Sequence, residues 1–381
     1  MRDLTKNELL KLLANVFPEI KTSDRLIIMV DFPRSEKQDN PAWAQRRQIA
    51  FDWYTLLTQT RAKPGPSHIE LVGYEQVGAN NGDLPPSVYR FKKFPTTLSE
   101  IISFGTSIEL DELFSSNQLF IALTEYSATA PLKNAARHYG FRAATMPGFG
   151  KEMIPALRID YHKVNARCEQ IKEKLDRAIS AEIQFRVKDK FSYHLSVDLR
   201  YREAHVSSGR FPSAGMAGNL PSGETFIVPY EGEKDEESNT HGVMPVQFDQ
   251  EIVLYHIVKN RARRVEGKGL RAEEEQNYLS HEPAYGNIAE LGFGVLQDFD
   301  LQPIGKVLLD EKLGFHLAFG RSDHFQGFVG PQQFSKPHAA VHIDRIYIDS
   351  FQPKVRVVSV VLGYPDGQEE MIIKDNKYTI F

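Results

Sequence analysis

The chain has 381 residues, of which 41% are hydrophobic, and its 46 lysines and arginines against 50 acidic residues give a formal net charge of −4. This length exceeds what one hydrophobic core usually serves, so two domains are expected. The balanced charge gives no electrostatic reason to expect nucleic acid or an anionic membrane as a partner, and favours a peptide or small-molecule substrate.

Cysteine content and hydropathy indicate the compartment. The single cysteine, Cys168, excludes an intramolecular disulfide and suits a reducing environment. Its neighbours form a helical pattern, which favours inert packing over a nucleophilic role. The N-terminus lacks the uninterrupted apolar run of a signal peptide, and no window approaches the roughly 18 apolar residues of a membrane span. The sequence therefore predicts a cytoplasmic protein.

Strand and helix patterns alternate through the first half. Thr5 and Glu8 form a capping-box pattern before a helical leucine repeat. Strands are expected at Arg25–Phe32, His68–Tyr74, Gln118–Leu123 and Arg142–Met146, and helices at Pro41–Arg61, Leu98–Ser103, Ala128–Tyr139 and Leu157–Ala178. This alternation predicts βαβ units, and hence an α/β domain with a mainly parallel sheet over residues 1–204. Gly148 and Gly150 resemble the start of a dinucleotide loop, but Met153 replaces its third glycine, so no nucleotide cofactor is expected.

The pattern changes in the second half. From about Ser180, apolar and polar residues alternate in short runs separated by turn residues, which is typical of antiparallel strands. The turn-rich segment His205–Gly218 is the expected boundary. Residues 205–381 are therefore expected to form an α+β catalytic domain that binds metal and is rich in antiparallel strands. Within it, the charged run Glu231–Ser238 is expected to be a solvated hairpin tip.

Potential metal ligands are densest between His316 and Asp344. His342 and Asp344 stand two residues apart in an apolar, β-branched run that indicates a strand. Side chains two apart on a strand share a face, so both would project toward one point. Imidazole and carboxylate groups that converge in this way form sites for Zn, Mn, Co or Fe(II).

Two acids further upstream complete a larger set. Glu224 follows a Pro-Ser-Gly turn, and Glu290 stands between apolar residues and two glycines that permit close backbone approach. Together with His316, His342 and Asp344 they could hold two divalent metals about 3.5–4 Å apart, with a bridging carboxylate and a water between them. Glu224 is also expected to take part in catalysis. Such a centre favours hydrolysis of an amide.

Four motifs carry a resemblance to a known family. NLPSGETF, AELGFG, LDEKLGFHLAFG and HID, in this order, resemble the thermophilic metallo-aminopeptidases of the aminopeptidase T and aminopeptidase S type. The resemblance covers the C-terminal half closely and the N-terminal half only through its α/β pattern. It implies that the five residues are ligands of Zn, Co or Mn, that the protein releases N-terminal amino acids from peptides, and that it forms a homodimer.

The chain departs from the family at one position. The family usually has a tyrosine seven residues after the first histidine of the site, where this chain has Asp323 followed by His324. We therefore expect Asp323 or His324 to stabilise the oxyanion instead. Strand alternation places His338, four residues before His342, on the ligand face, either as a further ligand or as a neighbour of the site. Glu311 is expected to form a surface ion pair with Lys312, although it could serve as a general base.

Two other functions remain open. His316, His342 and Asp344 alone would form the 2-His-1-carboxylate triad of a mononuclear Fe(II) ring-cleaving dioxygenase of the dihydroxypyridine dioxygenase type. Glu224 and Glu290 would then have no role, whereas the missing tyrosine favours this alternative. The same residues could also form a structural metal site or a peptide-binding module without catalysis.

Overall fold

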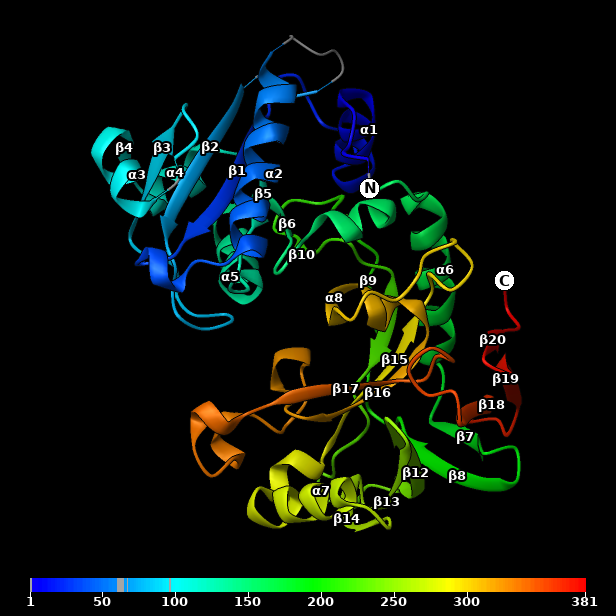
Figure 1. The fold of residues 1–381 in the computed structure, drawn as a ribbon. Coiled ribbons are helices and arrows are strands. Elements are labelled where there is room, and N and C mark those ends of the chain that lie inside the picture. Colours follow the sequence, from blue (N-terminus) through cyan, green and yellow to red (C-terminus); the bar gives the residue numbers. More distant parts are fainter. Residues whose placement is uncertain (1, 60–64, 67, 96) are drawn as a thin grey trace. The chain divides into compact units, whose positions relative to one another are not determined.

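The computed structural model describes residues 2–59, 65–66, 68–95 and 97–381, which form two compact units (Figure 1). Unit 1 comprises residues 1–165 and 207–222, and unit 2 comprises residues 166–206 and 223–381. Unit 1 contains a mainly parallel sheet with helices, and unit 2 contains antiparallel sheets with few helices. The predicted fold class is therefore confirmed.

The two units are discontinuous in sequence, whereas the sequence pattern predicted one boundary between residues 204 and 205. The hairpin of β7 (Ser180–Val187) and β8 (Phe191–Asp198) pairs with strands of unit 2. In contrast, β10 (Ala217–Asn219) returns to pair with β6 (Arg142–Thr145) of unit 1. Hydrogen-bonding partners far along the chain thus decide which unit each segment joins.

The sheet of unit 1 has the strand order β10-β6-β5-β1-β2-β3-β4. Its strands from β10 to β2 run parallel, and β3 and β4 continue it antiparallel. The remaining strands are β1 (Arg25–Phe32), β2 (His68–Glu75), β3 (Ser87–Phe91), β4 (Thr106–Glu109) and β5 (Leu119–Leu123). The helices are α1 (Lys6–Val16), α2 (Pro41–Thr58), α3 (Leu98–Phe104), α4 (Leu110–Ser116), α5 (Thr129–Tyr139) and α6 (Tyr161–Leu175), of which α6 continues into unit 2.

Local sequence explains most of these elements. The capping box predicted at Thr5 is present and begins α1. Strand β1 is apolar along nearly its whole length because it lies inside the parallel sheet, with α2 packed against it (Figure 1). The predicted end of α2 at Arg61 lies outside the described residues. Strands β3 and β4 were not predicted, because they lack the continuous apolar run of strands such as β1 and β5.

Unit 2 contains two sheets. The larger has the order β14-β13-β12-β8-β7-β18-β19-β20, and the smaller has the order β17-β16-β15-β11-β9. The larger sheet also includes β12 (His241–Phe248), β13 (Glu251–Val258), β14 (Arg261–Glu266), β18 (Val355–Gly363), β19 (Glu369–Lys374) and β20 (Lys377–Tyr378). The smaller comprises β9 (His205–Ser207), β11 (Glu224–Ile227), β15 (Ile288–Gly294), β16 (Phe315–Gly320) and β17 (His342–Ile346). The unit also contains the helices α7 (Leu270–His281) and α8 (Val307–Asp310).

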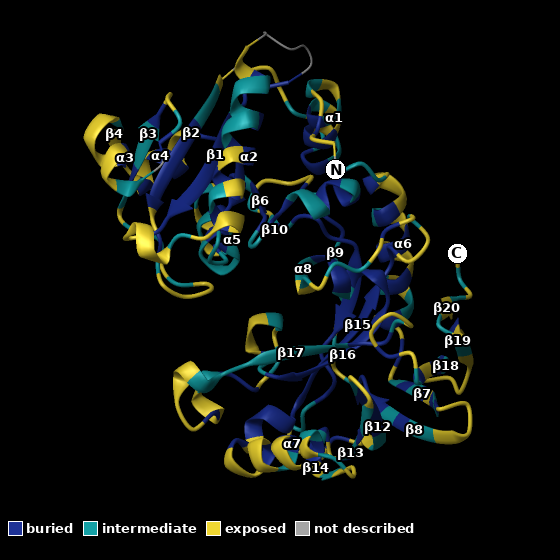
Figure 2. Cartoon of the chain, viewed as in Figure 1, coloured by how far each residue is buried: buried dark blue, intermediate teal, exposed yellow. Residues whose placement is uncertain are grey.

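The smaller sheet positions the candidate site. Every residue of β15 and β16 is buried, whereas β17 is mostly half-buried (Figure 2). Neighbouring pairs among β11, β15, β16 and β17 are antiparallel. The five predicted metal ligands all stand on these four strands. None of the helices in the described part of the chain is long and apolar enough to cross a bilayer.

Candidate metal centre

The register of the smaller sheet gathers the predicted ligands on one face. Across the strands, Glu290 pairs with Ala318, and Ala318 pairs with Asp344, so these three residues form one row. His316 lies in the next row, opposite Gly292. Because paired residues of antiparallel strands project to the same side, residues far apart in sequence meet above β15 and β16.

Two glycines of β15 allow other groups to approach the strand closely. A Cβ atom added to Gly292 would lie 2.0 Å from His316 Nε2, because the imidazole ring crosses β15 at this position. A Cβ at Gly294 would lie 2.3 Å from the carbonyl oxygen of Glu311. The two glycines of the AELGFG motif are therefore required by close approach of other groups.

The five side chains form two overlapping groups, each with three ligand atoms within 4.8 Å of one another. The first group is Glu224, Glu290 and His316, and the second is Glu290, His342 and Asp344. Glu290 belongs to both. Its Oε1 lies 3.2 Å from His316 Nε2, and its Oε2 lies 3.2 Å from His342 Nε2. One carboxylate thus stands between two imidazoles, with one oxygen facing each ring.

Hydrogen bonds fix the orientation of both imidazole rings. Nδ1 of His316 lies 3.2 Å from the carbonyl oxygen of Gly314, and Nδ1 of His342 lies 2.9 Å from that of Arg321. A carbonyl oxygen only accepts hydrogen bonds, so Nδ1 is the donor in each ring. Each Nε2 therefore faces the carboxylates, which is the arrangement that metal-binding histidines adopt.

The chemistry of the donor set fits divalent metals. Glu224, Glu290 and His316 are buried, and the side chain of Asp344 is 8% exposed. Oε2 of Glu224 is buried without a hydrogen-bond partner, a costly arrangement that a metal ion would relieve. Carboxylate oxygens and imidazole nitrogens in this number are ligands for Zn, Mn, Co or Fe(II).

A buried lysine lies beside the ligands. Lys312 donates hydrogen bonds to Glu224 Oε1 and Glu311 Oε1, and its side chain is 1% exposed. The expected pair of Glu311 with Lys312 is therefore present but not at the surface, because the chain folds it against β15. Two carboxylates thus share one ammonium group, while Glu290 and Asp344 lie beside the histidines, and the excess of carboxylates favours cations.

These charges shift the pKa values of the candidate ligands and of Glu311. Burial lowers the pKa of His316, but the contact with Glu290 and the charges of Glu224 and Asp344 outweigh it and raise the pKa to about 9. The pKa of His342 is also raised, because Asp344 and Glu290 outweigh its burial. Burial raises the pKa of Glu311 to about 8 despite the charge of Lys312. Protons and metal ions therefore compete for the two imidazoles.

Of the two residues expected to replace the family tyrosine, His324 borders the ligands. Its ring centroid lies 5.2 Å from that of His342. Burial and the charges of His342 and Arg321 lower its pKa to about 4. The carboxylate of Asp323 accepts two hydrogen bonds from Arg321, at 2.9 Å and 3.1 Å, and its side chain is 36% exposed.

The expected position of His338 on the ligand face was wrong. Pro337 begins a short 3-10 helix, Pro337–Ala339, so the strand starts only at His342. His338 is exposed in that helix. Strand alternation, which placed it beside His342, does not apply there.

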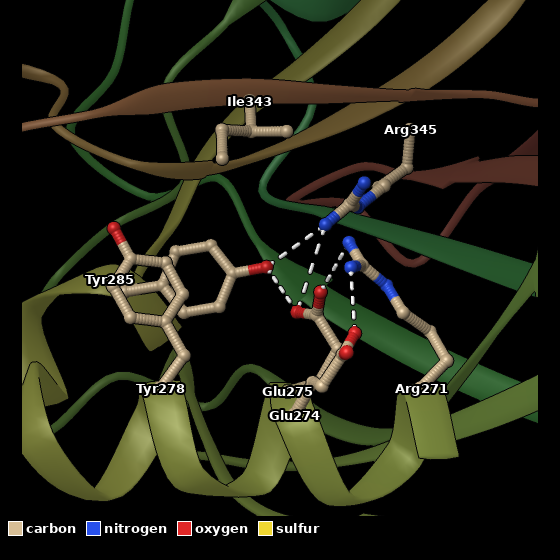
Figure 3. A pocket seen from close by; sticks show the side chains of 7 residues that line it. All are labelled: Arg271, Glu274, Glu275, Tyr278, Tyr285, Ile343 and Arg345. Atoms are coloured by element: carbon tan, nitrogen blue, oxygen red, sulfur yellow. Dashed lines mark hydrogen bonds and ion pairs between the residues drawn. The ribbon is translucent and has the colours of Figure 1, made fainter. Parts of the chain in front are cut away.

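The opposite face of β17 is anchored by a polar network. Arg345 and Ile343 alternate with the ligands along the strand and line a cavity of about 330 Å³ (Figure 3). Arg345 Nη2 donates to Tyr285 Oη over 2.8 Å, and Tyr285 Oη donates in turn to Glu275. Tyr255 donates to the same carboxylate. This network contacts the face of β17 that lies opposite the candidate ligands. It therefore fixes the position of the strand that carries His342 and Asp344.

Several residues of the site were not predicted. Phe226 follows Glu224 by two residues, so it shares the ligand face of β11, and its ring lies 4.5 Å from that of Phe325. Glu231 belongs to the run expected to be solvated, yet its side chain is 1% exposed. The two-residue spacing of Glu224 and Phe226 on a strand could have placed Phe226 beside the site from the sequence alone. The burial of Glu231 and Lys312, in contrast, depends on partners that are distant in the sequence.

Comparisons with known proteins bear on the fold. A scan against models of protein families found no match, and a search among curated proteins found none either. Among solved structures, the chain is similar to a 2,5-dihydroxypyridine dioxygenase from Pseudomonas putida KT2440, with a TM-score of 0.60. The two are 13% identical, and the match covers 99% of this chain and 98% of the other. At this identity the likeness establishes a shared fold, here combined with a buried set of potential metal ligands.

Proposed function

We propose that this protein is a metal-dependent aminopeptidase that hydrolyses N-terminal amino acids from peptides at a dinuclear centre. The observation that carries the proposal is the position of Glu290, whose two oxygens each lie 3.2 Å from the Nε2 of a different histidine. A carboxylate shared between two three-ligand groups is suited to bridging two ions. The four family-like motifs add support and favour Zn, Co or Mn as the metals.

Each residue has a definable task in amide hydrolysis. Two divalent ions bound here would supply an activated water and polarise the scissile carbonyl. Glu290 fixes the spacing of the two positions, and Lys312 holds one oxygen of Glu224 so that the other faces the site. His324 is neutral near pH 7 because its pKa is lowered, and it stands beside His342, where its N–H can donate to a developing oxyanion.

The second candidate is a mononuclear Fe(II) ring-cleaving dioxygenase. The similarity of fold to a 2,5-dihydroxypyridine dioxygenase over nearly the whole chain favours it. It would use His316, His342 and Asp344 as a facial triad. In the structure the two histidines belong to separate groups with Glu290 between them, and this arrangement favours the dinuclear hydrolase.

Activity assays with defined metals test the proposal. The purified protein, loaded with Zn, Co or Mn, should cleave aminoacyl p-nitroanilides and dipeptides, and a chelator should abolish the activity reversibly. Oxygen uptake with 2,5-dihydroxypyridine by the Fe(II)-loaded protein, without peptide cleavage, would contradict it. Inactivity in both assays would favour a structural metal or a binding module. The family resemblance also leads us to propose a homodimer, which sedimentation equilibrium would test.

A further inference from the structure

The segment between β16 and β17 carries two aromatic rings beside the candidate ligands. The rings of His324 and Phe325 lie 5.2 Å and 5.5 Å from that of His342, with interplanar angles of 87° and 82°. Phe325 also contacts Phe226, whose ring in turn lies 5.3 Å from that of His205. These contacts form a continuous series of rings from the ligand His342 to the edge strand β9. We call Phe226, Phe325 and His324 the aromatic wall.

A buried carboxylate holds this segment in place. Glu231 accepts hydrogen bonds from Ser322 Oγ at 2.7 Å, from the backbone N–H of Phe328 at 2.5 Å, and from Asn287 Nδ2 at 2.6 Å. Asn287 Nδ2 also donates to the carbonyl oxygen of Gly320, where the segment begins. Both ends of the segment that carries His324 and Phe325 are therefore fastened to one side chain.

Burying the carboxylate of Glu231 costs free energy, so its hydrogen bonds to the segment indicate that a fixed position of the segment matters. Taking a carboxylate out of water requires strong compensation, here from three hydrogen bonds and from Arg202 at 3.5 Å. The segment it fixes carries partly exposed rings rather than core residues, since the side chain of His324 is 34% exposed. Gly327 adds to the constraint, because a Cβ atom there would lie 2.2 Å from Ser322 Oγ. The rings are thus held in advance of any contact with a ligand.

We propose that the aromatic wall recognises an aromatic side chain at the N-terminus of the substrate. The inference rests on the proposed aminopeptidase function. Phe226 shares a strand face with Glu224, and Phe325 meets His342, so a ring bound against the wall lies next to the ligands. Aromatic rings prefer offset or edge-to-face partners with centroids about 4.5–7 Å apart, which is the geometry within the wall itself. An aromatic residue gains this interaction, whereas alanine does not.

Substrate discrimination measures the role of the wall. We compare kcat/KM for the p-nitroanilides of phenylalanine and alanine in the wild type, in Phe325→Ala and in Phe328→Ala. Phe328 belongs to the same segment and is 56% exposed, which makes it a matched control. Phe325→Ala should reduce the preference for phenylalanine about five- to tenfold, mainly through KM, with unchanged metal content. Phe328→Ala should retain the wild-type preference.

Three outcomes would overturn the proposed role of the aromatic wall in substrate recognition. They are no wild-type preference for phenylalanine, an unchanged preference in Phe325→Ala, or an equal loss of preference in both variants. A protein that hydrolyses neither substrate would refute the aminopeptidase function instead. In that case calorimetry with the hydroxamates of phenylalanine and alanine tests the wall without turnover. Tighter binding of the phenylalanine compound by the wild type and Phe328→Ala, but not by Phe325→Ala, is the expected result, and equal affinities would overturn the inference.

Discussion

Replacement of Glu290 by glutamine should affect both metal positions at once. Each oxygen of Glu290 faces a different histidine, so the variant loses the shared negative charge and presents an amide N–H₂ to one of the rings. Removing one member of a buried charged pair costs about 3–5 kcal/mol. Both metal affinities should therefore fall by at least about 100-fold.

Two matched variants separate this effect from a general loss of charge. Glu224 and Asp344 each belong to one group only, so Glu224→Gln and Asp344→Asn should each retain one tightly bound ion per chain. Elemental analysis after dialysis, together with titration calorimetry, gives the number of ions and their affinities, and circular dichroism checks folding. If the Glu290→Gln variant kept a tightly bound ion with wild-type affinity, the idea that Glu290 serves both metal positions would be refuted.

Two further predictions concern His316. Its raised pKa means that, in chelator-treated protein, the protonated ring contributes stability below about pH 6.5 that is lost as the pH rises through about 9. The melting temperature should fall across this range by an amount corresponding to roughly 3 kcal/mol, and a flat profile, or the same slope in His316→Asn, would contradict the assignment. Gly292→Ala should displace the imidazole, since its Cβ would lie 2.0 Å from Nε2. It should destabilise the protein by about 1–3 kcal/mol and weaken metal binding, and wild-type metal affinity in this variant would show that the ring need not lie there.

The sequence predicted the fold class and the five potential ligands because both depend on local patterns. Parallel strands such as β1 are short apolar runs, and the spacing of His342 and Asp344 on a strand places both on one face. The glycines of AELGFG also indicated close approach, which the structure explains through the ring of His316 over Gly292.

Features that depend on distant partners were not predictable in the same way. The run that contains Glu231 is rich in charge, and its first residue is buried through contacts with distant residues such as Ser322, Phe328 and Asn287. Similarly, Lys312 is buried because two carboxylates surround it. The error at His338 is local in origin, since Pro337 begins a turn that interrupts strand alternation.

Anomalous diffraction from crystals grown with Zn or Mn tests the dinuclear centre most directly. The expected result is two metal peaks per chain, with Glu290 between them, one bound by Glu224 and His316 and the other by His342 and Asp344. A single peak bound jointly by His316, His342 and Asp344 would contradict the dinuclear centre and favour the mononuclear dioxygenase.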